Sequence, residues 1–148
     1  MKHKFLLPDL VKMLRSKLFD LLPGFRGLQI LKLGSGSGGV SEVYHAKFLS
    51  GIAPMRHLVH FSLTYDCTDE IIKQLQRNCR RTLKILDVEY SFRVTDASVN
   101  DMLKCDKLIQ LHIFHTGKTY YDIVFTKKFT FHRFLVLAYA IFFISLQD

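Results

Sequence analysis

Apolar residues return at regular intervals along the chain, in four segments that share one pattern. Each segment is apolar at its first, fourth and sixth positions, and the segments are LQILKL (28–33), LVHFSL (58–63), LKILDV (83–88) and LIQLHI (108–113). Their starts are evenly spaced, except that the first step is slightly longer than the other two. Such a repeating period indicates stacked repeats, in which neighbouring units bury a shared core. We therefore expect four parallel strands with these twelve side chains buried: Leu28, Leu31, Leu33, Leu58, Phe61, Leu63, Leu83, Leu86, Val88, Leu108, Leu111 and Ile113.

A second signal recurs between these segments, where a hydroxyl residue precedes an acid in Ser41-Glu42, Thr68-Asp69 and Thr95-Asp96. A hydroxyl oxygen accepts hydrogen bonds from the free N–H groups of a helix's first turn, and an acid favours the positive end of the helix dipole. These pairs therefore predict three helix starts. Near-helical spacing of apolar residues follows each pair, and the expected inward positions are Val43, Ala46, Leu49, Ile71, Ile72, Leu75, Val99, Met102 and Leu103.

The segment LKILDVEYSFRVTDASVNDMLKCDKLIQLHI (83–113) resembles the cysteine-containing leucine-rich repeat family, with Thr95, Asp96 and Cys105 at the family's positions. The resemblance covers roughly residues 25–115 and concerns the fold more than the biological role. It implies an α/β leucine-rich-repeat solenoid of about four coils, right-handed, with parallel strands on the concave face and helices on the convex face.

Two features depart from the family pattern. The first unit is longer than the others, and Asp66 or Ser91 stands where the family often has Asn or Cys after the strand. In the family, the residues at those positions bond the backbone of neighbouring coils. We therefore expect less regular turns at these two positions.

The pattern divides the chain into three parts. Residues 1–24 predict a helix of an incomplete preceding coil, residues 25–118 hold the repeats, and residues 119–148 form an apolar tail outside the repeat pattern. The N-terminal helix carries an apolar stripe that we expect to face the first coil, ended by Pro23 and Gly24: Leu10, Val11, Leu14, Leu18 and Leu21.

The tail contains an unbroken apolar run at 134–146. A helix needs about 20 residues to cross a bilayer, which is more than this run provides, so we favour a helix or strand packed over the last coil. A membrane anchor stays open as an alternative. A translated intron is a third interpretation, because the tail is rich in Phe, Tyr, Ile and Lys and begins where the repeat breaks.

A glycine-rich stretch follows the first segment, and Gly34, Gly36 and Gly39 fit the pattern G-x-G-x-x-G. This stretch resembles the first motif of S-adenosylmethionine-dependent methyltransferases, which implies an S-adenosylmethionine- or nucleotide-binding enzyme as the alternative function. Lys32, however, stands where that family carries an acid. The nearest acid for a ribose, Asp66, comes later after Gly39 than such folds require. We therefore favour a turn between strand and helix.

Composition adds little to this picture. The 148 residues carry a formal charge of +8, but no basic patch with interleaved aromatics stands out along the chain, so the sequence does not favour a nucleic-acid partner. Cys67, Cys79 and Cys105 are odd in number and lack the spacing of zinc ligands. Cys79 and Cys105 end successive predicted helices, so we expect both to be buried thiols, and we place the protein in the cytoplasm or nucleus. The sequence contains no catalytic arrangement, and it predicts neither an enzyme, a cofactor nor a metal site.

The candidate binding surface is the inner sheet face of the repeats, where alternate strand residues point away from the core. The candidate contact residues are Ile30, Lys32, His60, Ser62, Thr64, Ile85, Asp87, Glu89, Gln110, His112 and Phe114. The acidic pair on the third strand, beside His112 and Phe114, suits a partner protein with a basic or amphipathic segment. The sequence therefore predicts a protein-protein interaction module.

The family resemblance adds substrate recognition in a ubiquitin ligase, as in the F-box/leucine-rich repeat receptors. LPDLVKMLRSKLFDLL (7–22) resembles the start of an F-box, the segment that docks such receptors onto the ligase adaptor. The implied partners are a substrate protein and a ubiquitin-ligase adaptor.

Overall fold

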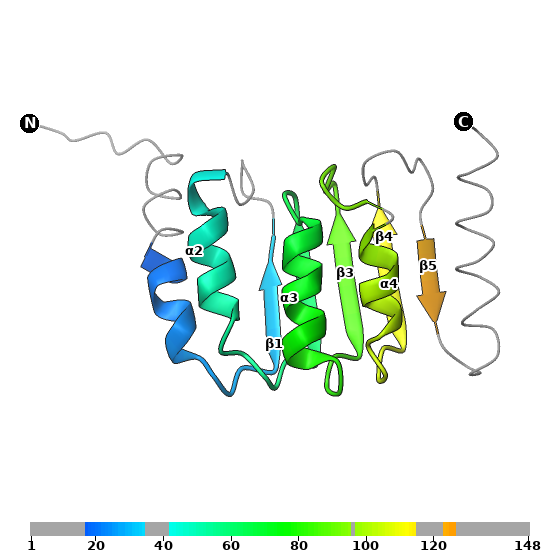
Figure 1. Ribbon diagram of the computed structural model, residues 1–148, viewed down its shortest axis with the longest axis horizontal. Coiled ribbons are helices and arrows are strands. Elements are labelled where there is room, and N and C mark those ends of the chain that lie inside the picture. Colours follow the sequence, from blue (N-terminus) through cyan, green and yellow to red (C-terminus); the bar gives the residue numbers. More distant parts are fainter. Residues whose placement is uncertain (1–16, 35–41, 96, 115–122, 127–148) are drawn as a thin grey trace, which may run out of the picture.

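The computed structural model describes residues 17–34, 42–95, 97–114 and 123–126. Five strands form one sheet in sequential order (Figure 1). The first four strands are parallel to one another, and the fifth is antiparallel to the fourth. The strands are β1 (Ile30–Leu33), β2 (His60–Thr64), β3 (Ile85–Glu89), β4 (Gln110–Phe114) and β5 (Ile123–Thr126).

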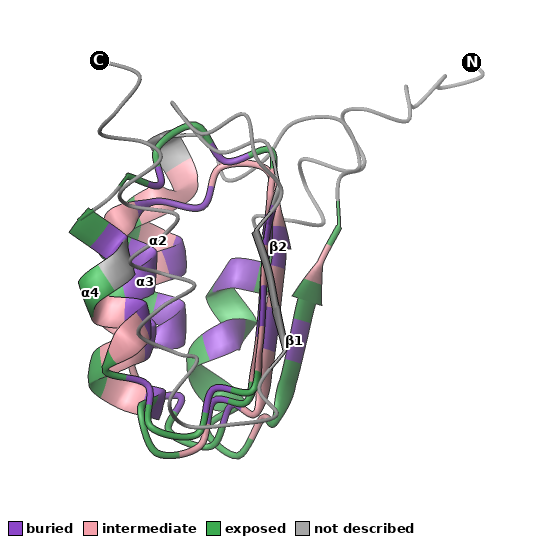
Figure 2. Cartoon of the chain, turned by 90° about the vertical axis from the view of Figure 1, so that its right-hand side faces the viewer, coloured by how far each residue is buried: buried purple, intermediate pink, exposed green. Residues whose placement is uncertain are grey.

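Helices alternate with the parallel strands and cover one face of the sheet (Figure 2). They are α2 (Glu42–Ile52), α3 (Asp69–Cys79) and α4 (Ala97–Leu103), and a short 3-10 helix, η1 (Leu22–Gly24), precedes β1. The predicted α/β alternation is thus confirmed, with β1–α2, β2–α3 and β3–α4 as successive strand–helix units. Each strand begins two residues later than its predicted segment, because the first apolar residue of each segment lies in the loop that leads into the strand.

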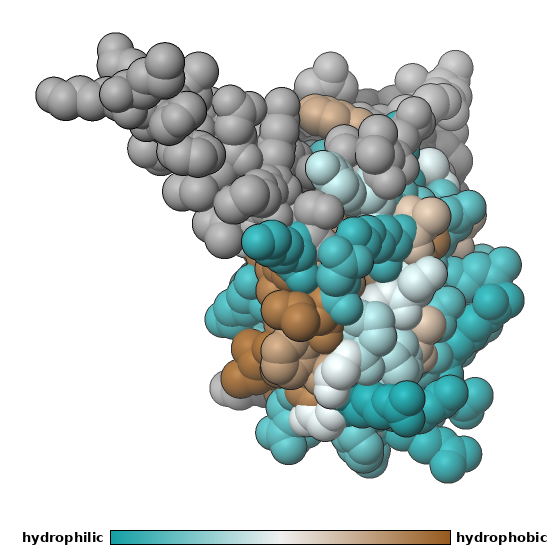
Figure 3. Space-filling model, turned by 90° about the vertical axis from the view of Figure 1, so that its left-hand side faces the viewer, coloured by the Kyte–Doolittle hydropathy of each residue, from teal (hydrophilic) through white to brown (hydrophobic). Residues whose placement is uncertain are grey.

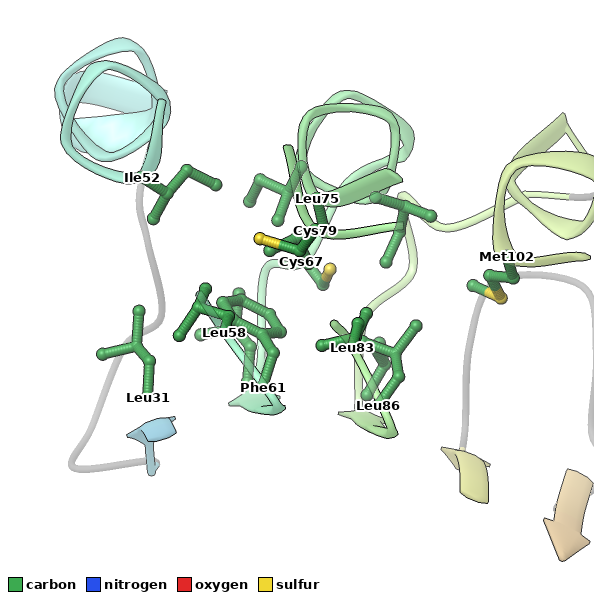
Figure 4. Packing of buried hydrophobic residues seen from close by; sticks show 14 of the residues in the cluster. Leu31, Ile52, Leu58, Phe61, Cys67, Leu75, Cys79, Leu83, Leu86 and Met102 are labelled. Carbon is green, nitrogen blue, oxygen red and sulfur yellow. The ribbon is translucent and has the colours of Figure 1, made fainter. Parts of the chain in front are cut away.

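The core lies between the sheet and the helices, where side chains from both layers meet (Figure 4). Ten of the twelve predicted strand positions are buried. Leu28 and Leu33 are only partly buried, since β1 is at the edge of the sheet. The register explains the continuity of this core, because Leu31 pairs with Phe61, Phe61 with Leu86, and Leu86 with Leu111.

The helix faces follow the predicted pattern in α3 and α4 more closely than in α2. Ile71, Ile72 and Leu75 of α3 and Met102 of α4 are buried as expected, and Leu103 is half-buried. In α2, the prediction for Ala46 is wrong, because this side chain is exposed and Leu49 is only half-buried.

The larger side chains of α2 take the inward positions instead. Phe48 and Ile52, four residues apart, are 0% and 1% exposed. Residues at this spacing share one helix face, and burying them removes more apolar surface from water than burying Ala46. The predicted positions Val43 and Val99 lie in helices, but their side chains fall outside the description.

The predicted inward face of the N-terminal helix is wrong in its described part, residues 17–21. Leu18 and Leu21 are exposed, whereas Phe19 and Leu22 are buried. Packing accounts for the difference, because the Phe19 ring lies edge-on to the Phe48 ring at a centroid distance of 5.2 Å. Leu10, Val11 and Leu14 lie outside the described residues.

Figure 3 shows apolar side chains gathered at this end of the molecule, where the exposed large apolar residues are Leu18, Leu21, Phe25 and Ile30.

The glycine stretch and the tail are described in part. Strand β1 ends at Leu33 and α2 begins at Glu42, so the stretch joins a strand to a helix; residues 35–41 lie outside the described residues. In the tail, β5 pairs with β4 and adds a strand to the sheet edge, while the apolar run 134–146 also lies outside the description. None of the helices in the described ranges is long and apolar enough to span a membrane.

Candidate binding surface on the sheet

The sheet face opposite the helices, called here the open face, holds the predicted contact residues in three straight rows. Along β2 and β3 these residues are half-buried and alternate with buried ones, because successive strand residues point to opposite sides of a sheet. The parallel register brings all eleven positions together. The rows are Ile30, His60, Ile85 and Gln110; Lys32, Ser62, Asp87 and His112; and Thr64, Glu89 and Phe114.

Asp87 lies at the centre of the open face, between histidines from the two neighbouring strands. His60 Nε2 lies 2.8 Å from Asp87 Oδ2, with hydrogen-bond geometry. His112 is directly across from Asp87 in the register, and its Nδ1 lies 2.9 Å from Oδ1. The three side chains are between 14% and 26% exposed. Three adjacent strands are thereby joined by one polar cluster.

Hydrogen bonding assigns the proton positions in this cluster. The Gln110 amide Nε2 lies 2.9 Å from His112 Nε2, and an amide nitrogen only donates, so this ring nitrogen accepts. In the neutral form of His112, this arrangement places the ring proton on Nδ1, beside the carboxylate. That contact is not aligned as a hydrogen bond, because Asp87 Oδ1 is a buried oxygen without a hydrogen-bond donor among the described residues. The Asp87 carboxylate thus lies between two imidazole rings, one on each neighbouring strand.

Glu89 gives the open face a second acid, two residues further along β3. Its carboxylate forms no hydrogen bond or ion pair with any residue that the structure describes. In the register, Glu89 pairs with Thr64 on one side and with Phe114 on the other. In the third row, Glu89 thus offers an available carboxylate beside the hydroxyl residue Thr64.

Two stacked tyrosines follow the third row at the carboxyl ends of the strands. Tyr65 and Tyr90 come directly after β2 and β3, and their rings stack at a centroid distance of 5.0 Å and an angle of 17°. Both residues have a left-handed backbone, with φ of 71° and 46°. Such a conformation costs about 1–2 kcal/mol for a residue other than glycine, and the ring stacking offsets about 0.5–1.5 kcal/mol of it.

This tyrosine pair was not predicted from the sequence, although a signal was present. Tyr65 and Tyr90 are separated along the chain by the same step as the strands that they follow. Together with Phe92, which is 70% exposed, they place aromatic residues directly after the carboxyl ends of β2 and β3. Aromatic side chains often dominate the binding energy at protein interfaces.

Ser91, at one of the two positions where the sequence departs from the family pattern, links two neighbouring units. Its hydroxyl is fully buried, accepts a hydrogen bond from the Cys67 N–H at 3.0 Å and donates to the Glu89 carbonyl oxygen at 2.9 Å. Ser91 thus bonds the backbone of the neighbouring unit, although Tyr90, just before it, has a left-handed backbone with φ of 46°. Asp66, at the matching position of the previous turn, has a left-handed backbone with φ of 61°.

Asp69 joins two neighbouring helices and so holds the units in register. The predicted cap is confirmed in α3, where the Thr68 hydroxyl accepts from the Ile71 N–H at 3.3 Å. The Asp69 carboxylate accepts from the Thr95 N–H at 2.8 Å, from the Thr95 hydroxyl at 2.6 Å and from the Ser98 hydroxyl. Partial burial by itself raises the pKa of Asp69, but these hydrogen bonds outweigh it, and the pKa lies below its usual value.

All three cysteines are buried free thiols, which confirms the burial expected for Cys79 and Cys105. Desolvation by burial raises the pKa of the Cys67 thiol far above its ordinary value, and it also raises that of Cys79. A protonated, buried thiol is a poor nucleophile. Within the described ranges, no three His, Cys, Asp or Glu side chains are arranged to hold a metal ion.

Comparison with known proteins found no match: no protein-family model, no curated protein and no solved structure matches the chain.

Proposed function

We propose that this chain is a leucine-rich-repeat solenoid whose open face, the concave face of such a fold, binds another protein. The observation that carries this proposal is the set of three straight rows on the open face, built from residues that recur once per unit of the sequence repeat. Repeat proteins use the surface across their stacked units for recognition. The function is binding, and the chain is not an enzyme.

The chemistry of the rows favours a partner with a basic or amphipathic segment. The chain as a whole is basic, with a formal charge of +8, yet the centre of the open face carries Asp87 and Glu89. Glu89 is available for an ion pair with a partner's lysine or arginine. The nearby Tyr90 ring, 40% exposed, adds a surface on which an arginine stacks.

Substrate recognition in a ubiquitin ligase is the process that we assign to this binding. This assignment depends on the resemblance to F-box/leucine-rich repeat receptors. It places a substrate protein on the open face and the ligase adaptor at the N-terminal segment 7–22, in the cytoplasm or nucleus.

The strand order argues against the alternative, an S-adenosylmethionine- or nucleotide-binding enzyme. Open α/β sheets bind nucleotides at a switch point, where the strand order reverses. The described sheet runs sequentially from β1 to β5, and the glycine stretch follows β1, an edge strand. Calorimetric titration with S-adenosylmethionine separates the two functions: saturable micromolar binding that is lost in Gly36→Asp would favour the enzyme.

The interaction test compares proteins captured from a cell lysate by the wild-type chain and by a double variant, Asp87→Lys with Glu89→Lys. The matched control, Asp20→Lys with Glu70→Lys, changes the net charge equally at side chains that are 59% and 71% exposed, away from the sheet. We expect mass spectrometry to find one set of partners with the wild type and the control that the double variant loses.

Circular dichroism must first establish that both variants fold. Glu89→Lys alone serves as the second probe, because the Glu89 carboxylate bonds no described residue. Equal capture by all variants would refute binding through the open face.

A further inference from the structure

A basic row lies along the edge of the sheet where the chain enters the parallel strands. In three successive units an arginine stands two residues before the first apolar residue of the repeat pattern: Arg26, Arg56 and Arg81. The fourth unit has Lys107 one residue further on. The loops that carry them lie stacked at the lower end of the molecule (Figure 2). Equivalent positions of stacked units thus form a line of cations, called here the basic row.

The side chains of the basic row are exposed and available. Neither the three arginines nor Lys107 form an ion pair with any described residue. Lys84, also exposed, adds a further cation at the start of β3. The acid on these loops, Asp106, lies 3.6 Å from Arg80, outside the row. The edge therefore keeps a strong net positive charge.

The helix dipole explains only part of this charge. Basic residues are favourable at the negative end of a helix, but the effect falls off within the last turn. Arg81 follows α3 closely and fits that explanation. Arg56 comes four residues after the end of α2, and Arg26 precedes β1 in a loop. The helix dipole therefore does not explain why a cation recurs at Arg26 and Arg56.

A hollow between the first two units indicates the chemistry of a ligand that the basic row would bind. Arg26, Arg56, His57 and Pro54 line it, and its volume is about 410 Å³. Two guanidinium groups and an imidazole offer N–H donors there, and arginine forks match the oxygens of a phosphate group. The hollow is thus suited to one phosphate, with the rest of the basic row leading away from it.

The spacing of the row favours a linear polyanion. Neighbouring strands lie about 4.8 Å apart, so four units place their cations in a line of about 15 Å. A membrane surface is bound best by cations spread over a broad face, whereas the cations of the basic row lie along one line, as the phosphates of a phosphodiester backbone do. Phe25, next to Arg26 and 48% exposed, offers a ring on which a base stacks.

We propose that the basic row binds the phosphate backbone of single-stranded nucleic acid, on a different surface from the protein partner of the open face. The sequence did not favour such a partner, because the cations lie one whole repeat apart along the chain. Stacking of the units brings them into one line. Binding through about four phosphates makes log K fall with log salt with a slope of about −3.

Fluorescence anisotropy tests this with a labelled single-stranded oligonucleotide of about 12 nucleotides, a length within the range of such sites. The triple variant Arg26→Gln, Arg56→Gln and Arg81→Gln removes three charges from the row. The matched control Lys17→Gln, Lys73→Gln and Arg77→Gln removes three exposed charges elsewhere. We expect the triple variant to bind about tenfold or more weakly, with a salt slope smaller by about 2, and the control to stay within about twofold.

Two outcomes overturn the proposal. Equal weakening in both variants would show that net charge alone attracts the oligonucleotide, and absence of wild-type binding at low salt would exclude the site. A parallel arm uses vesicles with anionic lipid, and binding to these without binding to the oligonucleotide would replace nucleic acid by a membrane surface. All six substituted side chains are exposed, so we expect both variants to fold. Circular dichroism spectra that match the wild type would verify this before binding is compared.

Discussion

Asp69 is expected to contribute more to stability than any other exposed or half-buried acid at a helix start, because it bonds the next unit. Replacing it by alanine removes three acceptor contacts, to the Thr95 N–H and hydroxyl and to the Ser98 hydroxyl. Ser98 is 0% exposed, and a buried polar group left without a partner costs about 1–3 kcal/mol. The contacts to Thr95 are exposed to solvent and contribute less. We expect Asp69→Ala to lower the free energy of unfolding by about 2–3 kcal/mol.

The assay is urea unfolding followed by far-UV circular dichroism, with Glu70→Ala as the matched control. Glu70 is the next acid in the same helix turn, 71% exposed, and contacts His45 at 3.6 Å. A contact at this distance with a carboxylate that is mostly in solvent contributes about 0–1 kcal/mol. If Asp69→Ala costs no more than Glu70→Ala, the carboxylate does not hold the units together and our interpretation of the contact is wrong.

The pH dependence gives a second measurement of the same contact. Because the folded-state pKa of Asp69 is lowered, the ionised carboxylate stabilises the fold fully above the unfolded pKa of about 3.9. This contribution is lost as the pH falls through the lower folded-state value. We therefore expect the stability gap between the wild type and Asp69→Asn to narrow below about pH 4. A gap that does not change between neutral and acidic pH would contradict the role of the charge.

Three further predictions concern buried groups. Ser91→Ala leaves the Cys67 N–H without its acceptor, and urea unfolding should show a loss of about 1–3 kcal/mol; an unchanged midpoint would refute this. Gly51→Ala, which in an ordinary helix stabilises by about 1 kcal/mol, should instead destabilise in the same assay, because the new Cβ would lie 2.8 Å from Leu22 Cβ. The thiols of Cys67 and Cys79 should react with a thiol reagent only as fast as the protein unfolds, and rapid labelling of the folded chain would contradict their burial.

The strands and their buried faces could be predicted from the sequence. Leucine and its apolar equivalents at the first, fourth and sixth positions are a local signal, and ten of the twelve positions are buried. The places of the eleven candidate residues in the sheet followed from the same pattern, because a strand residue next to a buried one points to the other side of the sheet. The role of Thr68 as a helix cap was likewise predicted from the sequence.

The buried face of a helix was harder to predict from the sequence where apolar residues occur on several sides of the helix. Leu18, Phe19, Leu21 and Leu22 follow one another so closely that the spacing alone does not select a face. The aromatic contact between Phe19 and Phe48 decides it. In α2, the larger Phe48 is buried where Ala46 was expected, since burial of the larger side chain contributes more.

The sequence by itself therefore determined the repeat, the order of strands and helices, and the side of each strand that faces the core, because these depend on residues within a few positions of one another. Only the tertiary structure decided which polar groups meet. Parallel stacking brings His60, Asp87 and His112 into one cluster, stacks Tyr65 on Tyr90, and collects the basic row. The physical reason is that pairing in register turns the separation of a whole repeat along the chain into a distance of about 4.8 Å between strands.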